Sequence, residues 1–301
     1  MFKIIVHEKI ATDVYRMVLE APLIAKKRKA GQFIIIRLDE HGERIPLTIA
    51  DANPEVGTIT IIYQTVGKTT MQLATKEVGG FIQDVVGPLG HPTEIRNFGT
   101  CVCVGGGIGK APLFPIAEAL KKAGNEVISI VGARGADLII LEEELRVVSD
   151  ELIVCTDDGS HGRKALVTEP LKEILESGKK VDLVVAIGPT VMMKFVSKVT
   201  EPYGIKTLVS LNSIMIDGTG MCGGCRVTIG GETKFTCVDG PEFDGHKVDW
   251  EQMIKRMGSY KPYETIALER WEHRREQDME ARKERLCRLE EEIRKATSHG
   301  R

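Results

Sequence analysis

The stretch TCVCVGGGIGKAPLFPIAEALKK, residues 100–122, reads as a strand, a glycine-rich turn and a helix in direct succession. The near-continuous apolar run before the glycines is typical of a strand buried on both faces. Glycines let the main chain approach a pyrophosphate, and the helix N-terminus supplies N–H donors. The turn therefore offers candidate nucleotide-binding residues: Gly105, Gly106, Gly107, Ile108, Gly109 and Pro112.

This turn departs from the standard nucleotide motifs. Lys110 stands at the third glycine position of G-x-G-x-x-G, and the Lys-Ser/Thr ending of a phosphate-binding P-loop is missing. Taken alone, the glycines are equally compatible with a plain strand-to-helix turn. The case for a nucleotide therefore depends on what surrounds the turn.

Strands and helices continue to alternate over residues 97–215. The strand candidates EVISIVGAR, ELIVCTDD, VDLVVAIGP and KTLVSLNSI are separated by helical stretches. This pattern predicts a doubly wound parallel sheet with ligands at the carboxyl ends of its strands. Each loop, taken by itself, could be a simple strand-to-helix turn. Because all of them lie at the same edge of the sheet, a cofactor site is favoured. The further candidates there are Gly132, Arg134, Asp157, Asp158, Gly159, Gly188, Pro189 and Met192.

Residues 1–96 have a different rhythm, with six short apolar runs separated by turn residues. Such spacing predicts an antiparallel β-barrel or sandwich, interrupted by one short helix at about residues 69–75. An arginine can bind a pyrophosphate bidentately, and a glycine-led helix start can hold its other side. A surface arginine and an ordinary helix cap would look the same. The candidates are Arg44, Pro46, Leu47 and Thr48, with Gly67, Lys68, Thr69 and Thr70.

Residues 216–248 are rich in glycine and contain three grouped cysteines in the spacing D-x4-C-x2-C-x11-C, namely Asp217, Cys222, Cys225 and Cys237. Thiolates on glycine loops are the ligands of an iron–sulfur cluster, and Asp217 falls where the plant-type spacing places its first cysteine. Either a carboxylate oxygen binds one iron or the fourth ligand lies elsewhere. A structural zinc site with one aspartate and three cysteines is the alternative.

Residues 249–301 form a charged, helix-prone tail with a narrow apolar stripe. The stripe consists of Leu268, Trp271, Met279, Leu286, Leu289 and Ile293. Met279, Leu286 and Ile293 recur every seven residues, as in a coiled-coil seam. We predict that this tail is a docking helix for a partner subunit. A solvated helix lying on its own domain is the alternative.

The bulk composition excludes several classes of partner. Lysine plus arginine number 41 against 43 acids, so the chain lacks the basic surface that nucleic acid requires. No run reaches the roughly 18–20 apolar residues of a membrane span, and charges interrupt the first residues where a signal peptide would be apolar. We expect a cytoplasmic protein without a membrane or nucleic-acid partner.

In this order the motifs resemble the ferredoxin–NADP reductase superfamily, in which a flavin-binding barrel precedes a nicotinamide-binding α/β domain. The resemblance implies that Arg44 binds the FAD pyrophosphate, that Thr48 hydrogen-bonds near flavin N5 as the catalytic residue, and that Pro46, Leu47, Ile62, Tyr63 and the Gly67–Thr70 turn complete the flavin site. The glycine turns at residues 105–112 and 188–192 resemble the family's nicotinamide loops.

The cysteine segment narrows the resemblance to the electron-transfer subunits of dihydroorotate dehydrogenase. Asp217 in place of a cysteine resembles the small subunits of NADH-dependent reduced ferredoxin–NADP oxidoreductases, also described as sulfide dehydrogenases. This implies an oxidoreductase subunit that moves electrons among NAD(H), FAD and a [2Fe-2S] cluster. It also implies a larger flavin and iron–sulfur partner subunit through which ferredoxin is reached, and electron bifurcation. A dihydroorotate dehydrogenase role and a non-enzymatic redox or zinc regulator are the alternatives.

NAD(H) is expected rather than NADP(H). The second parallel strand ends at residues 132–137, where only Arg134 could meet a 2′-phosphate and Asp137 would repel one. This arginine could equally contact the pyrophosphate or solvent.

Overall fold

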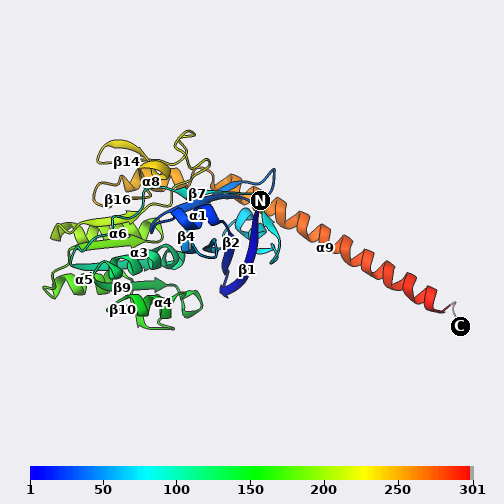
Figure 1. Cartoon of the computed structure of the whole chain (residues 1–301), viewed down its shortest axis with the longest axis horizontal. Coiled ribbons are helices and arrows are strands. Elements are labelled where there is room, and N and C mark those ends of the chain that lie inside the picture. The colour runs from blue at the N-terminus through cyan, green and yellow to red at the C-terminus, as the bar shows by residue number, and fades with distance from the viewer. Residues whose placement is uncertain (299–301) are drawn as a thin grey trace.

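The computed structural model describes the main chain of residues 1–298 and the side chains of residues 1–286, 288 and 290. Two seven-stranded sheets dominate it, one antiparallel and one mainly parallel, and a long helix leads away from them (Figure 1). The predicted combination of a β-barrel and a doubly wound α/β sheet is confirmed, together with the small cysteine-containing segment and the helical tail.

The first sheet has the strand order β6-β1-β2-β5-β4-β3-β7, and all its neighbouring strands are antiparallel. Its core is dominated by branched side chains such as Ile34 and Ile36, from alternate positions of β3, which have no exposed surface. The elements are β1 (Phe2–Ala11), β2 (Val14–Glu20), α1 (Pro22–Lys27), β3 (Phe33–Arg37), β4 (Arg44–Asn53), β5 (Thr58–Gln64), α2 (Lys68–Ala74), β6 (Phe81–Ile82) and β7 (Asp84–Leu89).

Two details of this sheet differ from the sequence prediction. The last of the six apolar runs, FIQDVVGPL at residues 81–89, forms two strands, β6 and β7, which lie at opposite edges of the sheet. The helix α1 was not predicted, because its six residues are too few for a helical period to stand out. Pro22 begins it, at a position where proline costs no hydrogen bond.

The second sheet has the order β11-β10-β9-β8-β12-β13-β16 and is parallel except for β16. The strand β8 carries the glycine turn and lies between β9 and β12, so the chain reverses its direction of winding there. The strands are β8 (Thr100–Gly106), β9 (Glu126–Ala133), β10 (Glu151–Thr156), β11 (Arg163–Lys164), β12 (Leu183–Ile187), β13 (Thr207–Ser210) and β16 (Glu242–Asp244).

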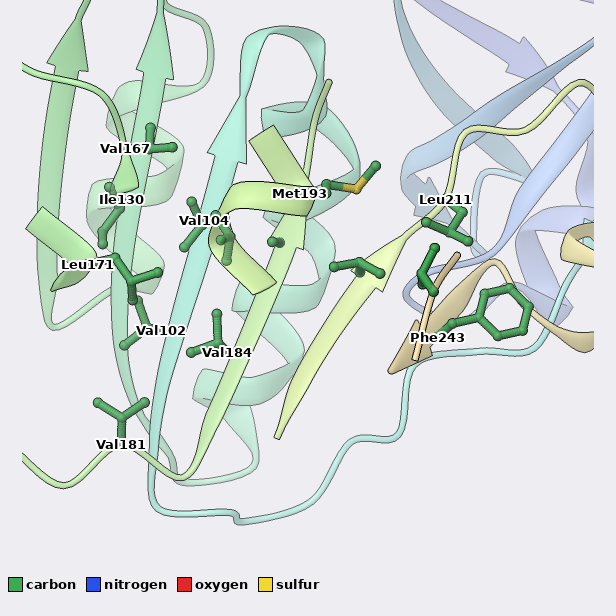
Figure 2. Packing of buried hydrophobic residues seen from close by; sticks show 14 of the residues in the cluster. Val102, Val104, Ile130, Val167, Leu171, Val181, Val184, Met193, Leu211 and Phe243 are labelled. Atoms are coloured by element: carbon green, nitrogen blue, oxygen red, sulfur yellow. The ribbon is translucent and has the colours of Figure 1, made fainter. Parts of the chain in front are cut away.

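Helices cover both faces of this sheet, because both faces of its strands are apolar. On one face, α3 and α4 pack on a buried cluster that includes Leu113 and Leu145. On the other, α5 and α6 supply Leu171 and Met193 to a core that reaches Phe243 of β16 (Figure 2). The helices and short 3-10 turns are η1 (Gly107–Gly109), α3 (Lys110–Lys122), η2 (Ala136–Leu138), α4 (Glu142–Val148), α5 (Thr168–Glu176), α6 (Thr190–Thr200) and η3 (Glu201–Tyr203).

The cysteine-containing segment is built into this frame. A hairpin of β14 (Arg226–Ile229) and β15 (Glu232–Phe235) leads to α7 (Thr236–Asp239), and the chain then adds β16 to the edge of the second sheet. The helix α8 (Trp250–Met257) buries Met253 in the same core as Phe243. Residues 216–248 therefore share a core with the α/β sheet.

From Lys261 onward the tail forms one helix, α9 (Lys261–Ser298), which contacts α2 and then extends away from the rest of the chain, whereas α8 at its start packs in the core (Figure 1). Leu268 and Trp271 are half-buried, whereas every described side chain from Glu272 to Leu286 is exposed. Leu289 and Ile293 of the predicted stripe lie outside the residues whose side chains are described. No helix in residues 1–298 combines the length and the apolar character that a membrane crossing needs.

Candidate functional site

The candidate flavin residues Arg44–Thr48 begin β4, the strand between β3 and β5. Arg44 is exposed, while Pro46, Leu47 and Thr48 are half-buried. Thr48 pairs with Phe33 of β3 in the antiparallel ladder. The guanidinium is thus presented at the surface of the barrel, and the threonine lies nearer its interior.

Glu43 connects Arg44 to the second candidate motif. Its carboxylate accepts hydrogen bonds from Thr69 Oγ1, at 2.5 Å, and from Lys68 Nζ, at 3.1 Å. Partial burial opposes ionisation, but these hydrogen bonds outweigh it and lower the pKa of Glu43. Arg44 and the start of α2 are therefore neighbours, as one pyrophosphate site requires.

The start of α2 is capped by its own residues. Thr70 Oγ1 accepts from Gly67 N, at 3.2 Å, and from Val66 N, at 3.0 Å. Glu43 was missed in the sequence. Its only signal there is its place directly before Arg44, because its contacts span about 25 residues of chain.

Ile62 and Tyr63 have opposite orientations on β5. Tyr63 is 1% exposed, and its hydroxyl lies 2.8 Å from His7 Nε2, so its side chain belongs to the barrel core. Burial raises the pKa of Tyr63. Only its main chain is available to a flavin. Ile62 packs outward against Ala111 of α3 and Ile140.

The two predicted nicotinamide loops are in contact at the carboxyl edge of the second sheet. Gly105 pairs with Ile187 across β8 and β12, which places the turn of residues 105–109 beside Gly188. A Cβ atom at Gly106 would lie 2.3 Å from Met192 Sδ, and one at Gly109 would lie 2.2 Å from the Ile187 carbonyl oxygen. The backbone contact requires glycine at position 109, whereas a side chain at position 106 would have to displace Met192.

Gly107 has another role. Its φ of +56° favours glycine, and no atom lies within 4 Å of the position that its Cβ would take. The main chain at the centre of the loop is therefore bare and open, as contact with a pyrophosphate requires.

The remaining nucleotide candidates lie on the same edge. Gly132 of β9 pairs with Gly106 on one side and with Cys155 of β10 on the other. Asp158 N donates to the Arg134 carbonyl oxygen at 3.2 Å, and both side chains are exposed. The exposed residues Asp157 and Gly159 belong to the same turn, so the structure brings all of the predicted turns together at one edge.

The cysteine-containing segment packs on the barrel. Cys225 and Cys237 are each 1% exposed and belong to one apolar cluster with Phe33 and Ile35 of β3 and with Met215. Their sulfur atoms are 3.1 Å apart, wider than a disulfide bond of about 2.05 Å. Both thiols are therefore free and point toward each other.

Asp217 and Cys222 lie on the neighbouring loop. The two carboxylate oxygens of Asp217 accept from Thr219 N and Cys222 N, each at 2.9 Å, and these hydrogen bonds lower the pKa of Asp217. Cys222 is exposed, and its sulfur accepts from Gly224 N at 3.5 Å. Burial, followed by the Cys225 thiol and the more distant charge of Asp217, raises the pKa of Cys237 to about 12.

The chemical type of these ligands and their position on adjoining loops fit a [2Fe-2S] cluster. In the part of the chain that the structure describes, no three His, Cys, Asp or Glu side chains converge closely enough to hold a single metal ion. Three thiols and one carboxylate nevertheless lie on adjoining loops, and Gly218, Gly220 and Gly223 give these loops left-handed turns. A cluster is larger than one ion and takes ligands from such wrapping loops.

Replacing Asp217 with cysteine tests the carboxylate ligand. We expect Asp217→Cys to keep the cluster but to shift its reduction potential and its electron paramagnetic resonance spectrum, because a thiolate changes ligand charge and softness. Asp217→Ala should also alter both, with Glu232→Ala, at an exposed position at the end of the β14–β15 hairpin, as the control. An unchanged potential and spectrum in Asp217→Ala would show that the aspartate is not a ligand.

Comparison with known proteins agrees with this geometry. Residues 212–249 match the family model of the iron–sulfur cluster binding domain of dihydroorotate dehydrogenase B. These residues include all four predicted cluster ligands. The match places the iron–sulfur assignment ahead of the zinc alternative.

Relatives align over most of the chain. A dihydroorotate dehydrogenase B (NAD+) electron transfer subunit homolog from Thermotoga maritima is 50% identical over 263 residues, 87% of this chain and 93% of the relative. The corresponding electron transfer subunit of Bacillus velezensis is 33% identical over 252 residues, 80% of this chain and 95% of that protein.

A solved structure also matches closely. It is a chain of the NADH-dependent reduced ferredoxin–NADP oxidoreductase, studied for flavin-based electron bifurcation. It superposes with a TM-score of 0.86 at 47% identity and covers 90% of this chain and 98% of its own length. Together these relatives show that the chain belongs to the dihydroorotate dehydrogenase B electron transfer subunit family, which makes it the electron-transfer subunit of a flavin and iron–sulfur oxidoreductase.

Proposed function

We propose that this subunit passes electrons between NAD(H), FAD and a [2Fe-2S] cluster, and from there to or from a larger flavin and iron–sulfur subunit. In this proposal residues 1–96 hold FAD, residues 97–215 hold the nicotinamide nucleotide, and residues 216–248 hold the cluster. The tail, residues 249–301, contacts the partner. NAD(H) exchanges two electrons and the cluster one, and the flavin supplies the chemistry that connects them.

One observation carries this proposal: the candidate flavin strand lies between the other two sites. Thr48 pairs with Phe33, and Phe33 packs in the same cluster as Cys225 and Cys237. On the other side, Ala50 of β4 packs in one cluster with Ala111, directly after the glycine turn and Lys110. A flavin held by β4 would therefore adjoin both the nucleotide loop and the cluster.

The residues have separate tasks in this arrangement. Arg44 would bind the FAD pyrophosphate, and Thr48 would donate a hydrogen bond near flavin N5. Lys68 and Thr69 would hold the phosphates from the side of α2, which requires that Glu43 release them. The loops at residues 105–109 and 188–192 would position the nicotinamide nucleotide.

NADH should reduce the flavin faster than NADPH at equal concentration. Arg134 is the exposed cation at the end of β9, and Asp137, Asp157 and Asp158 are exposed around it, where a 2′-phosphate would be repelled. Stopped-flow absorbance of the flavin measures both rates, and Arg134→Ala should change neither by more than a few-fold. Faster reduction by NADPH would contradict the assignment.

We propose flavin-based electron bifurcation among NADPH, NAD and ferredoxin as the activity of the assembled enzyme. The 47% identity to the ferredoxin–NADP oxidoreductase chain supports it, and so does Asp217 at the position of a cluster ligand. The second candidate function is electron transfer to or from a dihydroorotate dehydrogenase, which the names of the relatives favour. Purification of the native complex and identification of its partner distinguishes the two.

The exposed part of α9 should bind the larger subunit. Truncation after Glu272 keeps the half-buried Leu268 and Trp271 and removes the exposed Met279 and Leu286. Burying two such side chains contributes on the order of 1.5–3 kcal/mol each, so the partner's dissociation constant should rise at least about tenfold.

Sedimentation or calorimetry with the larger subunit measures this change. The double variant Met279→Glu and Leu286→Glu should reproduce the loss, while Glu280→Gln with Lys283→Gln should not. FAD and cluster content should stay at the level of the full chain. If the truncated protein bound its partner normally, or if it lost FAD, the docking role of α9 would be wrong.

A further inference from the structure

Lys110, the first residue of α3, has no solvent-exposed surface. Its Nζ donates to the Leu138 carbonyl oxygen at 3.0 Å and to the Gly132 carbonyl oxygen at 3.2 Å. Desolvation alone lowers the pKa of Lys110 to about 8, and no carboxylate of the described residues offsets it. A buried ammonium held only by carbonyl groups costs stability, so its retention calls for a purpose beyond packing.

One of the two carbonyl groups that hold this ammonium, that of Gly132, belongs to β9, and the other, that of Leu138, belongs to the loop after β9. We call residues 136–141 the bridging segment, because they contact both sheets. Thr12 N, in the turn between β1 and β2 of the barrel, donates to the Asp137 carbonyl oxygen at 3.3 Å. Ser160, after β10 of the α/β sheet, accepts from Ala136 N at 2.8 Å. Lys110 binds the same segment through the Leu138 carbonyl oxygen.

Apolar packing joins the bridging segment to the barrel at the same point. Ile140 is buried in a cluster with Val14 and Ile62 of the barrel and with Ala111, the residue after Lys110. Leu141 packs against this cluster and has a left-handed backbone with φ of +55°, which is strained for leucine. The segment is therefore fixed in one conformation by contacts from several sides.

This location relates the lysine to the nucleotide loop. Gly132, whose carbonyl oxygen accepts from the ammonium, pairs with Gly106 of the neighbouring strand. The ammonium therefore lies close to the point where the glycine turn and the end of β9 meet. A pyrophosphate at that turn would bring negative charge toward a buried cation that has no carboxylate partner. The N-terminus of α3, a helix of 13 residues, points its N–H groups the same way.

We infer that Lys110 is a positioning residue for nicotinamide-nucleotide binding: its ammonium ties the glycine turn to the bridging segment and so fixes the nucleotide site relative to the flavin barrel. This inference rests on the proposed function, since it needs a nucleotide at the turn of residues 105–109. The inference assigns a role to Lys110, which stands where the usual motif has glycine. It also assigns to the bridging segment the role of linking the nucleotide site to the barrel.

The test uses the full chain loaded with FAD and cluster, and NAD+ as the probe. Lys110→Met keeps the unbranched stem, one atom shorter, but removes the charge and the donors of the side chain. The dissociation constant of NAD+, followed by the change in flavin absorbance, should rise at least about tenfold, as loss of charge-assisted hydrogen bonds implies. The limiting rate of flavin reduction by NADH should fall as well, because the two sites are no longer held together.

If Lys110 only stabilised the fold, its replacement would lower the thermal midpoint of the protein in the absence of nucleotide. The thermal midpoint of Lys110→Met without nucleotide should change little, because the two lost hydrogen bonds are offset by no longer burying an ammonium. If the methionine variant does not fold, Lys110→Gln gives the same comparison, with an intermediate dissociation constant expected. Lys122→Met, at an exposed position of the same helix, should bind NAD+ like the wild type.

Two results would overturn the inference, and they are distinguishable. If the wild type binds NAD+ and Lys110→Met binds it equally well, Lys110 has no positioning role, while the proposed function stands. If the wild type binds neither NAD+ nor NADPH, the proposed function fails and the inference fails with it.

Discussion

Arg44→Ala should release the flavin while the cluster stays in place. The exposed guanidinium beside α2 is the strongest candidate cation for a pyrophosphate, and a bidentate charge-assisted contact contributes about 1.5–3 kcal/mol per hydrogen bond. Its loss should weaken FAD binding on the order of 100-fold. The ratio of flavin to protein after gel filtration measures the effect.

The control for this variant is Arg16→Ala, on the barrel strand β2, where the arginine pairs with Glu8 at the surface. That variant should keep its flavin. A full complement of FAD in Arg44→Ala would remove Arg44 from the site. Release of FMN alone from the denatured wild type would show that no pyrophosphate is bound there.

Cys222→Ser should abolish or strongly destabilise the cluster. Serine is a poor ligand for iron compared with a thiolate, and the exposed position of Cys222 means that the substitution leaves the packing intact. Iron and sulfide content should fall well below stoichiometric, whereas FAD content should not change. Met221→Ser, at the adjacent and 89% exposed residue, is the matched control. An undiminished cluster in Cys222→Ser would exclude this thiol as a ligand.

Local sequence patterns predict most of the fold. Five of the parallel strands of residues 97–215 are predicted as buried apolar runs followed by glycine or a polar turn, because strand period and turn chemistry are local properties. The sixth, β11, is missed because its two residues, Arg163 and Lys164, are charged and exposed. The helix α2 was predicted at about residues 69–75 and occupies Lys68–Ala74. The grouping of the glycine turns at one edge followed from the parallel order of the strands.

What the sequence could not reveal depends on contacts between distant residues. In the run TITIIYQ the period of two places Tyr63 on the core face with Ile59 and Ile61, but nothing local decides that Ile62, on the opposite face, packs against the other sheet. Glu43 and Lys110 are equally inconspicuous in the sequence, since one acts on α2 and the other on a loop 28 residues away. The edge strand β16 is only three residues long, too short for a period to show.

The most direct test of the proposed electron path is an anaerobic titration of the full-length purified chain with NADH. Visible absorption follows the flavin, and electron paramagnetic resonance follows the cluster in the same samples. The proposed path predicts that NADH bleaches the flavin and that a reduced [2Fe-2S] signal then appears without any partner subunit. A colourless protein, or a flavin that NADH bleaches while an intact cluster with a potential above that of NADH stays oxidised, would contradict it.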